Sequence, residues 1–176
     1  AHALLVDAED LRPYECDGLT LFREVPVAVV LPETEAQVVA ILKACHVARL
    51  PVVARGAGTS LSGGSTPHRN GIVLSLAKFR RIIAIDALAR TAVVQPGVRN
   101  LAISEAAAAY GLYYAPDPSS QIACSIGGNV AENAGGVHCL KYGLTVHNVR
   151  RVRGLLITGE PVEFGGASLD SAGYDL

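Results

Sequence analysis

The feature that most constrains this fold is a run of glycines that directly follows a short apolar segment. Residues 51–54 read Pro-Val-Val-Ala, which is typical of a buried strand, and residues 55–64 read Arg-Gly-Ala-Gly-Thr-Ser-Leu-Ser-Gly-Gly. Because glycine permits positive φ and has no side chain, successive backbone N–H groups in such a loop can converge on one anion. Hydroxyls from Thr59, Ser60 and Ser62 add further donors. We therefore predict a phosphate-binding loop over residues 55–64, with a mobile surface loop as the alternative.

Two common phosphate-binding motifs do not fit this loop. In the Rossmann motif the third glycine would fall at Leu61, a helix would begin inside the motif, and a carboxylate would end the next strand. Residues 67–71 indicate turns instead, and the next predicted strand, residues 72–76, is followed by Ala-Lys. A P-loop requires Gly-Lys-Ser/Thr, which this loop does not contain. The loop is therefore predicted to belong to a fold that is not Rossmann.

A second glycine cluster spans residues 127–136 and reads Gly-Gly-Asn-Val-Ala-Glu-Asn-Ala-Gly-Gly. Glycine at a helix start costs up to ~1 kcal/mol relative to alanine, so some other interaction should compensate. A flat ring or a phosphate close to the backbone would do so, and the Asn133 amide could bind a carbonyl or a ring nitrogen. Tight packing of the helix against its neighbours is the alternative that remains open.

The order of the apolar segments predicts an α+β fold. A β-branched strand at residues 27–31 is followed by a capping box, Thr34 with Gln37, which opens a helix over residues 35–50. Together with the strand at residues 51–54, this is a β-α-β start. Apolar residues recur along one face of the helix, at Val38, Ile41, Leu42, Cys45 and Ala48.

The rest of the chain continues the alternation of strands and helices. A helix at residues 100–110 is predicted to end at Gly111, and a short helix to begin at Ser125. Further strands are predicted at residues 72–76, 82–85, 91–94, 152–157 and 162–164. The first three are expected to join one mixed sheet, and the last two to form a hairpin through a Thr-Gly-Glu turn.

Composition excludes several classes of function. The chain has 176 residues, half of them hydrophobic, with 15 basic and 16 acidic side chains and no block of like charge. No surface for nucleic acid is therefore expected, and no apolar run approaches the roughly 20 residues of a membrane-spanning helix. The four cysteines form no metal-binding pattern and are expected to be free thiols. Without a signal peptide, the protein is expected to be cytoplasmic, with both ends trimmed.

Residues 51–64 resemble the pyrophosphate loop of FAD-linked oxidases of the vanillyl-alcohol oxidase and p-cresol methylhydroxylase type. Residues 115–120 and 133–148 are similar to the FAD-binding subunits of bacterial glycolate oxidases within that family. Residues 14–18 and 94–98 fit the same pattern, so the resemblance covers nearly the whole chain. It implies an α+β domain of two subdomains with FAD between them.

The resemblance also implies domain boundaries and site residues. Residues 1–25 would be an N-terminal segment, residues 26–112 the first FAD-binding subdomain, and residues 113–176 an incomplete second one. The pyrophosphate would lie on the loop, and the flavin end near the second cluster. The residues implied in cofactor binding are Arg55, Gly56, Ala57, Gly58, Thr59, Ser60, Leu61, Gly63, Gly64, Gly97, Pro116, Asp117, Ser119, Ser120, Ser125, Gly127, Gly128, Asn129, Asn133, Gly136, Tyr142 and Gly143.

The resemblance further implies the chemistry and what this chain lacks. In such enzymes a 2-hydroxy acid, here glycolate, loses a hydride to FAD and becomes a 2-oxo acid. Some relatives carry a flavin-linked histidine where this chain has Thr59, so non-covalent FAD is expected. The cap domain and the substrate-binding histidines and arginines are absent, so no catalytic residue is expected in this chain. Substrate would bind only with that missing C-terminal part.

Several further residues admit two interpretations. Amides at the helix start, residues 125–128, are hypothesised to stabilise negative charge on the reduced ring. His138 and His147 are interpreted as structural, and Cys124 and Cys139 as buried free thiols. The basic cluster Arg150, Arg151 and Arg153 is interpreted as a solvated strand edge.

Three alternatives to a glycolate-oxidising flavoprotein remain. The first is a related D-lactate or D-2-hydroxyglutarate dehydrogenase, or more distantly a reductase of cell-wall precursor synthesis. The second is a nucleotide-binding module without redox activity, and the third an interaction subunit that has lost FAD. Partner subunits of a glycolate oxidase complex, and membrane association through them, are also open.

Overall fold

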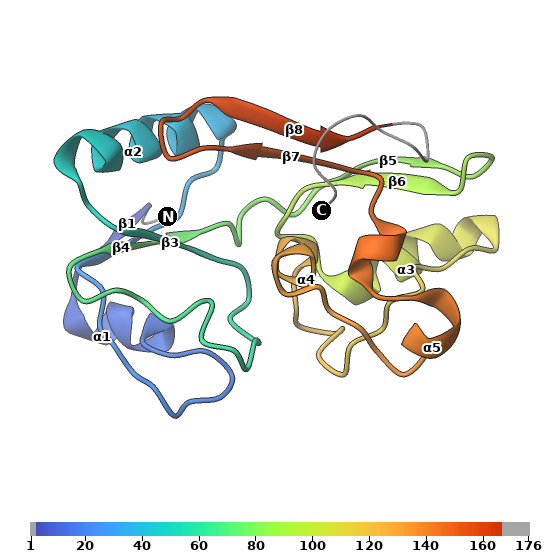
Figure 1. Ribbon diagram of the computed structural model, residues 1–176, viewed down its shortest axis with the longest axis horizontal. Helices are drawn as coiled ribbons and strands as arrows, with labels where there is room; N and C mark the ends of the chain where they lie inside the picture. Colours follow the sequence, from blue (N-terminus) through green and yellow to red (C-terminus); the bar gives the residue numbers. More distant parts are fainter. Residues whose placement is uncertain (1–2, 167–176) are drawn as a thin grey trace.

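The computed structural model describes residues 3–166, which contain three separate β-sheets. The largest has four strands in the order β1 (Leu4–Leu5), β2 (Ala28–Val30), β4 (Ile72–Ser75) and β3 (Val52–Arg55). β2, β4 and β3 are parallel, and β1 pairs with β2 in the antiparallel sense. Every residue of β4 is buried, as expected for a strand covered on both faces. This sheet occupies one half of the molecule (Figure 1).

One face of this sheet is covered by α2 (Glu35–Ala48), which begins at the predicted capping box. The Gln37 N–H donates to the Thr34 hydroxyl at 3.3 Å, and the Gln37 side chain accepts from the Thr34 N–H at 3.3 Å. Val38, Leu42 and Cys45 are buried against the sheet, whereas Ala48 is exposed. The predicted apolar face is therefore confirmed except for its last member.

The opposite face is covered by an element that sequence reasoning missed. A short helix, α1 (Ala8–Leu11), continues into the 3₁₀ turn η1 (Arg12–Tyr14). Leu11 packs against Val29 and Val73, which are fully buried. The segment is too short for a periodic pattern, so its signal in the sequence is weak.

The predicted single mixed sheet is wrong in one respect. β4 joins the sheet of β2 and β3, as predicted, and lies between them. β5 (Ile82–Asp86) and β6 (Thr91–Val94) form a sheet of their own, and about half of their residues are exposed. The sheet of β2, β3 and β4 therefore does not continue into these two strands.

A second core supports the other half of the molecule. α3 (Asn100–Ala107) continues into η2 (Ala108–Tyr110) and ends at Gly111 with φ +68°, as predicted. α4 (Ile126–Glu132) begins after Ser125, also as predicted. Val98, Ile103 and Ile126 form the buried cluster between these elements. Two later short helices, α5 (Cys139–Tyr142) and η3 (Thr145–Asn148), were not predicted.

The predicted C-terminal hairpin is present as β7 (Arg151–Leu155) and β8 (Pro161–Gly165). It lies across α2 in Figure 1. Arg153 forms two contacts with Glu35 of α2, at 2.6 and 2.7 Å, and Leu155 packs beside Val38. The hairpin therefore contacts the first half of the chain, and the subdomain boundary at residues 112/113 stays a prediction. Within the described residues, no helix is long and apolar enough to cross a membrane.

Candidate functional site

The two glycine-rich segments meet across a cleft of about 150 Å³. Residues 54–65 form one wall, and residues from the turn before α4 and from α4 itself form the other. The segments lie about 70 positions apart in the sequence, yet the fold brings them together. The predicted site residues that line the cleft are Gly56, Ala57, Gly58, Thr59, Ser60, Gly64, Ser120, Ser125, Gly128 and Asn129.

The glycine loop beside this cleft carries unpaired hydrogen-bond donors. The backbone N–H groups of residues 57–61 make no hydrogen bond to any residue in the described range 3–166. The hydroxyls of Ser65 and Ser125 are buried and also have no partner in that range. Because an unpaired buried polar group costs free energy, the two buried hydroxyls indicate a ligand that would pair them, and the free N–H groups nearby are available to the same ligand. Ser65 was missed, although its position at the end of a Ser-rich glycine loop was a usable signal.

The walls of the cleft contact each other directly at two places. A Cβ at Gly56 would lie 2.1 Å from the Ser125 hydroxyl oxygen, so glycine lets the loop approach Ser125 closely there. The Ser62 hydroxyl also donates to the Glu132 carboxylate at 2.6 Å. Further lining residues that the sequence reasoning did not select are Ala54, Ser65, Pro118, Cys124, Ala131, Glu132 and Ala134.

The amides at the start of α4 are mostly committed to the protein. The Ile126 N–H donates to the Val98 carbonyl and the Gly127 N–H to the Pro96 carbonyl, each at 2.8 Å. A Cβ at Gly127 would lie 2.8 Å from the Pro96 Cβ. Tight packing, the alternative left open above, therefore accounts for Gly127, and the hypothesis that this helix start stabilises a charged ring loses two of its donors.

A buried polar network fixes the base of the cleft. The Asn100 side chain donates to the Asn129 side-chain oxygen and to the Pro116 carbonyl, both at 3.0 Å. The Asn129 amide in turn donates to the Cys124 sulfur at 3.3 Å. Both asparagines are almost fully buried, so the network orients α4 toward the loop.

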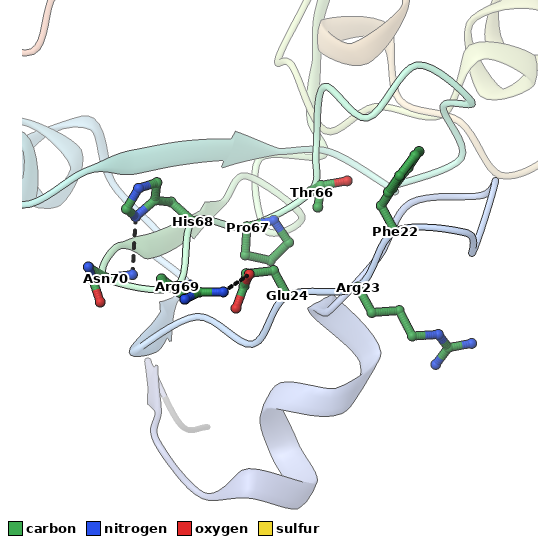
Figure 2. A pocket seen from close by; sticks show the side chains of 8 residues that line it. All are labelled: Phe22, Arg23, Glu24, Thr66, Pro67, His68, Arg69 and Asn70. Atoms are coloured by element: carbon green, nitrogen blue, oxygen red, sulfur yellow. Dashed lines mark hydrogen bonds and ion pairs between the residues drawn. The ribbon is translucent and has the colours of Figure 1, made fainter.

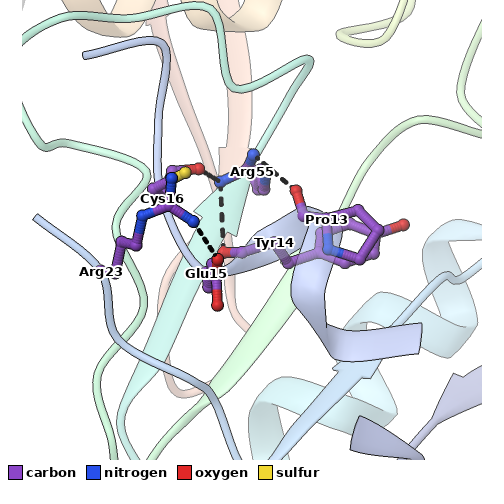
Figure 3. A network of polar contacts seen from close by, with 6 residues as sticks. All are labelled: Pro13, Tyr14, Glu15, Cys16, Arg23 and Arg55. Atoms are coloured by element: carbon purple, nitrogen blue, oxygen red, sulfur yellow. Dashed lines mark hydrogen bonds and ion pairs between the residues drawn. The ribbon is translucent and has the colours of Figure 1, made fainter. Parts of the chain in front are cut away.

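The remaining predicted site residues do not line the cleft. Arg55 donates to carbonyl groups of the N-terminal segment (Figure 3), and the Gly63 N–H donates to Asp17 at 2.7 Å. Asn133 ends α4 in a left-handed conformation and accepts from the Val146 N–H at 3.0 Å. The full set outside the cleft is Arg55, Leu61, Gly63, Gly97, Pro116, Asp117, Ser119, Gly127, Asn133, Gly136, Tyr142 and Gly143.

A polar cluster surrounds Asp117, which precedes the cleft residue Pro118 in the sequence. The Asp117 carboxylate contacts the His138 ring nitrogen Nδ1 at 2.6 Å and also accepts from the His138 N–H. The hydrogen bond to the His138 side chain lowers the pKa of Asp117. Tyr142 packs edge-on against Tyr113, with ring centroids 6.2 Å apart. His138 thus has a defined partner, which sequence reasoning did not foresee.

The other residues with two interpretations are accounted for by structural contacts. The His147 ring accepts from the Leu144 N–H at 3.1 Å, in agreement with a structural role. All four cysteines are free, with Cys124 buried and Cys139 half-buried. Arg151 and Arg153 are exposed and pair with Glu163 and Glu35, which confirms a solvated edge.

A larger open hollow of about 450 Å³ lies elsewhere on the surface (Figure 2). Its charged groups are already paired: Arg69 contacts Glu24 at 3.3 Å, and Arg23 contacts Glu15. None of the predicted site residues lines it. The smaller cleft, with its unpaired donors, is therefore the better candidate site.

The α+β fold of this chain, with a glycine loop rich in hydrogen-bond donors that faces a helix, is that of an anion-binding domain. It is not a Rossmann fold. A family model described as "FAD binding domain" matches residues 26–165. The chain belongs to this FAD binding domain family, and the resemblance drawn from its residues is confirmed. The matched region begins after the N-terminal segment, which contacts the glycine loop through Asp17.

Curated relatives support the same assignment. The chain is 61% identical over 168 residues to "Glycolate oxidase subunit GlcD" of Escherichia coli (strain K12), covering 96% of this chain and 34% of that protein. It is 41% identical to the protein of the same name from Bacillus subtilis (strain 168), covering 93% of this chain and 35% of that protein. The chain thus spans about a third of the length of these relatives.

Solved structures show that the fold is shared. An alkyldihydroxyacetonephosphate synthase superposes with a TM-score of 0.82 at 20% identity, covering 98% of this chain and 36% of that one. The 6-hydroxy-D-nicotine oxidase of Arthrobacter nicotinovorans superposes with a TM-score of 0.76 at 22% identity, covering 92% and 35%. The predicted fold class, an α+β FAD-binding domain of the vanillyl-alcohol oxidase type and not Rossmann, is confirmed.

Proposed function

We propose that this chain binds FAD non-covalently in the cleft between the glycine loop and α4. The observation that carries the proposal is the set of free N–H groups at residues 57–61 beside the unpaired hydroxyls of Ser65 and Ser125. A diphosphate offers the acceptors that these donors lack, and hydrogen bonds to charged oxygens are the stronger kind. Thr59 lies on the cleft wall in place of a residue that could be joined to the flavin, which supports non-covalent binding.

Each wall of the cleft has its own task in this proposal. The glycine loop holds the diphosphate through backbone N–H groups, without a positively charged side chain in the lining. α4 presents Gly128 and the buried Asn129, so a flat ring can approach the backbone without meeting a large side chain. Residues that the sequence placed in the site but that lie outside the cleft, such as Asp117 and Tyr142, stay predictions for the flavin end.

We infer that a longer protein containing this domain, like the relatives named above, oxidises a 2-hydroxy acid. Glycolate is the first candidate substrate. Bound FAD supplies the hydride acceptor for such a reaction. The relatives named glycolate oxidase subunits support glycolate, and those named D-lactate dehydrogenase, 40% identical, and D-2-hydroxyglutarate dehydrogenase, 34% identical, support the wider substrate class. The word "subunit" in the first of these names supports assembly with further subunits.

The cofactor proposal is tested by incubating the chain with FAD, desalting it and recording its absorbance spectrum. A retained flavin band that trichloroacetic acid releases into solution supports non-covalent binding, and a band that stays with the precipitated protein contradicts it. The absence of any retained band, in a chain whose circular dichroism shows a folded α+β protein, would reject the cleft as a flavin site.

The substrate proposal needs a longer protein that contains this domain. That protein, loaded with FAD and free of oxygen, is mixed separately with glycolate, D-lactate and D-2-hydroxyglutarate while flavin absorbance is followed. The fastest bleaching identifies the preferred acid. Equal and negligible bleaching by all three would contradict a 2-hydroxy-acid oxidoreductase.

A further inference from the structure

The glycine loop is supported from behind by a segment that precedes the matched family region. Residues 13–18 contact the loop and Arg55 through hydrogen bonds that do not use the free N–H groups of residues 57–61. The Gly18 N–H donates to the Ser60 carbonyl at 2.9 Å, which ties the end of this segment to the middle of the loop. The segment is therefore part of the structure that gives the loop its shape.

Arg55 anchors the segment through its carbonyl groups. Its guanidinium donates to the Cys16 carbonyl at 2.9 Å and to the Ser65 carbonyl at 3.1 Å, with longer contacts to Tyr14 and Pro13 (Figure 3). Burial lowers the pKa of Arg55, and the nearby Cys16, Tyr14 and Asp17 partly offset that effect. A buried cation without a carboxylate in direct contact depends on these carbonyl groups, so the arrangement is tightly specified.

Asp17 completes the support with a carboxylate that is 6% exposed. One carboxylate oxygen accepts the Gly63 N–H at 2.7 Å and lies 3.5 Å from the Ser60 hydroxyl oxygen. The other accepts the Leu19 N–H at 3.0 Å. Each oxygen therefore accepts a backbone N–H, one from the loop and one from the segment. An amide in its place would set an NH₂ group against one of those donors.

We propose that Asp17 is a positioning residue for the cofactor site, and that residues 13–18 complete that site. By accepting the Gly63 N–H, Asp17 fixes the turn that follows residues 57–61, whose N–H groups have no partner in residues 3–166. Binding of a diphosphate then needs no rearrangement of the loop, and such preorganisation increases affinity. The proposal rests on the proposed function.

The test is a titration of FAD, followed by flavin fluorescence, on the wild-type chain and two matched variants. Asp17→Asn should weaken FAD binding by about 30-fold, because both carboxylate acceptors are engaged. Asp86→Asn is the control: Asp86 accepts the Ala89 N–H at 2.8 Å in the β5–β6 turn, the same kind of bond away from the cleft. The control should change FAD affinity less than twofold.

A second measurement separates positioning from general stability. Amide hydrogen exchange, followed by NMR, should accelerate in Asp17→Asn at Gly63 and Gly18, whose N–H groups bond to Asp17 and to the Ser60 carbonyl, while the protection of β4 is kept. If Asp17→Asn does not fold, Gly18→Ala replaces it, because a Cβ there would lie 2.9 Å from the Thr59 carbonyl oxygen and displace the segment from the loop. Gly18→Ala should weaken FAD binding by about tenfold.

The outcomes separate this inference from the proposed function. If the wild-type chain binds FAD and Asp17→Asn or Gly18→Ala binds it within twofold of the wild-type affinity, the role of Asp17 is overturned. The proposed function would still stand. A wild-type chain that binds no FAD would reject the proposed function, and the inference with it. Weaker binding in the variant, with local exchange at the loop and an unchanged control, supports the inference.

Discussion

The two glycine-rich segments have similar compositions but opposite physical roles. In the loop at residues 56–65, the N–H groups of residues 57–61 are unpaired and the support comes from behind. In the cluster at residues 127–136, the Gly127 N–H is bonded to Pro96, and a Cβ at Gly136 would lie 2.2 Å from an Asp117 carboxylate oxygen. The first segment supplies donors to a ligand, whereas the second mainly lets protein elements pack closely.

This difference shows how far glycine content alone can be interpreted. Glycine permits both close approach of a ligand and close approach of another part of the chain, and composition does not distinguish them. What distinguishes them is the fate of the N–H groups, which depends on tertiary contacts. Variants that change one of these roles at a time can therefore break or sharpen the comparison.

The largest effect is expected for Gly58→Val in the donor loop. Gly58 has φ +71°, and a Cβ there would lie 2.2 Å from the Arg55 guanidinium. A β-branched residue is strained at positive φ, so the loop should change shape and FAD affinity fall by about 100-fold. Equilibrium dialysis with FAD measures this.

The matched control is Gly111→Val. Gly111 also has positive φ, but nothing lies within 4 Å of a Cβ placed there, and it does not line the cleft. It should lower stability while FAD affinity stays within twofold of the wild type. Similar affinity losses in both variants would show that the loop is sensitive to global stability, and the comparison would fail.

The next largest effect is expected where the loop meets α4. Ser125→Ala removes a buried hydroxyl that has no partner in residues 3–166, so FAD affinity should fall about tenfold without loss of stability. Ser104→Ala is the control, because its hydroxyl accepts the Tyr114 N–H at 2.9 Å. That variant should lose about 1 kcal/mol of unfolding free energy and keep its affinity. The reverse pattern would place Ser125 among the structural hydroxyls.

Neighbouring glycines in α4 should respond in opposite ways. Gly127→Ala meets Pro96 at 2.8 Å, so it should destabilise the fold by about 1 kcal/mol with little change in FAD affinity. Gly128→Ala has only the Ser125 hydroxyl within 4 Å, at 3.4 Å, so the helix should become more stable by up to ~1 kcal/mol. Because Gly128 lines the cleft, its variant should bind FAD more weakly. Urea unfolding and FAD titration of both would decide, and parallel behaviour would contradict the assignment.

Local patterns predicted most elements, because they depend on neighbours along the chain. The capping box of α2 and the end of η2 at Gly111 are both local features, and both are present. Arg55 was assigned to the cofactor, yet strand alternation in β3 places it on the same side as Val53, away from α2. Asp17 and Ser65 could not be ranked, because their importance comes from contacts between distant segments. The pairing of β5 with β6 alone, apart from the main sheet, also depends on tertiary contacts and could not be predicted from local patterns.

The smallest effect concerns the Asp117–His138 contact beside the second segment. The His138 hydrogen bond lowers the pKa of Asp117, so the contact stabilises the folded state above the unfolded value of about 3.9. That contribution is lost as the pH falls through the lowered pKa of the folded state. His138→Ala should therefore lower the unfolding temperature by less than about 2 °C at pH 5, as for the loss of a surface ion pair. Near pH 2 its unfolding temperature should equal that of the wild type.

Direct titration of the Asp117 carboxyl carbon by NMR checks the cause. Its midpoint should rise toward the ordinary value in His138→Ala, while the bond from the His138 N–H to the carboxylate at 3.2 Å is kept. His46→Ala is the control, because His46 makes no ion pair within residues 3–166, and it should leave the Asp117 midpoint unchanged. If FAD affinity also fell in His138→Ala, the polar cluster around Asp117 would belong to the ligand site. The contrast between a loop that supplies donors and a cluster that only packs would then hold for Gly127 and Gly136 alone.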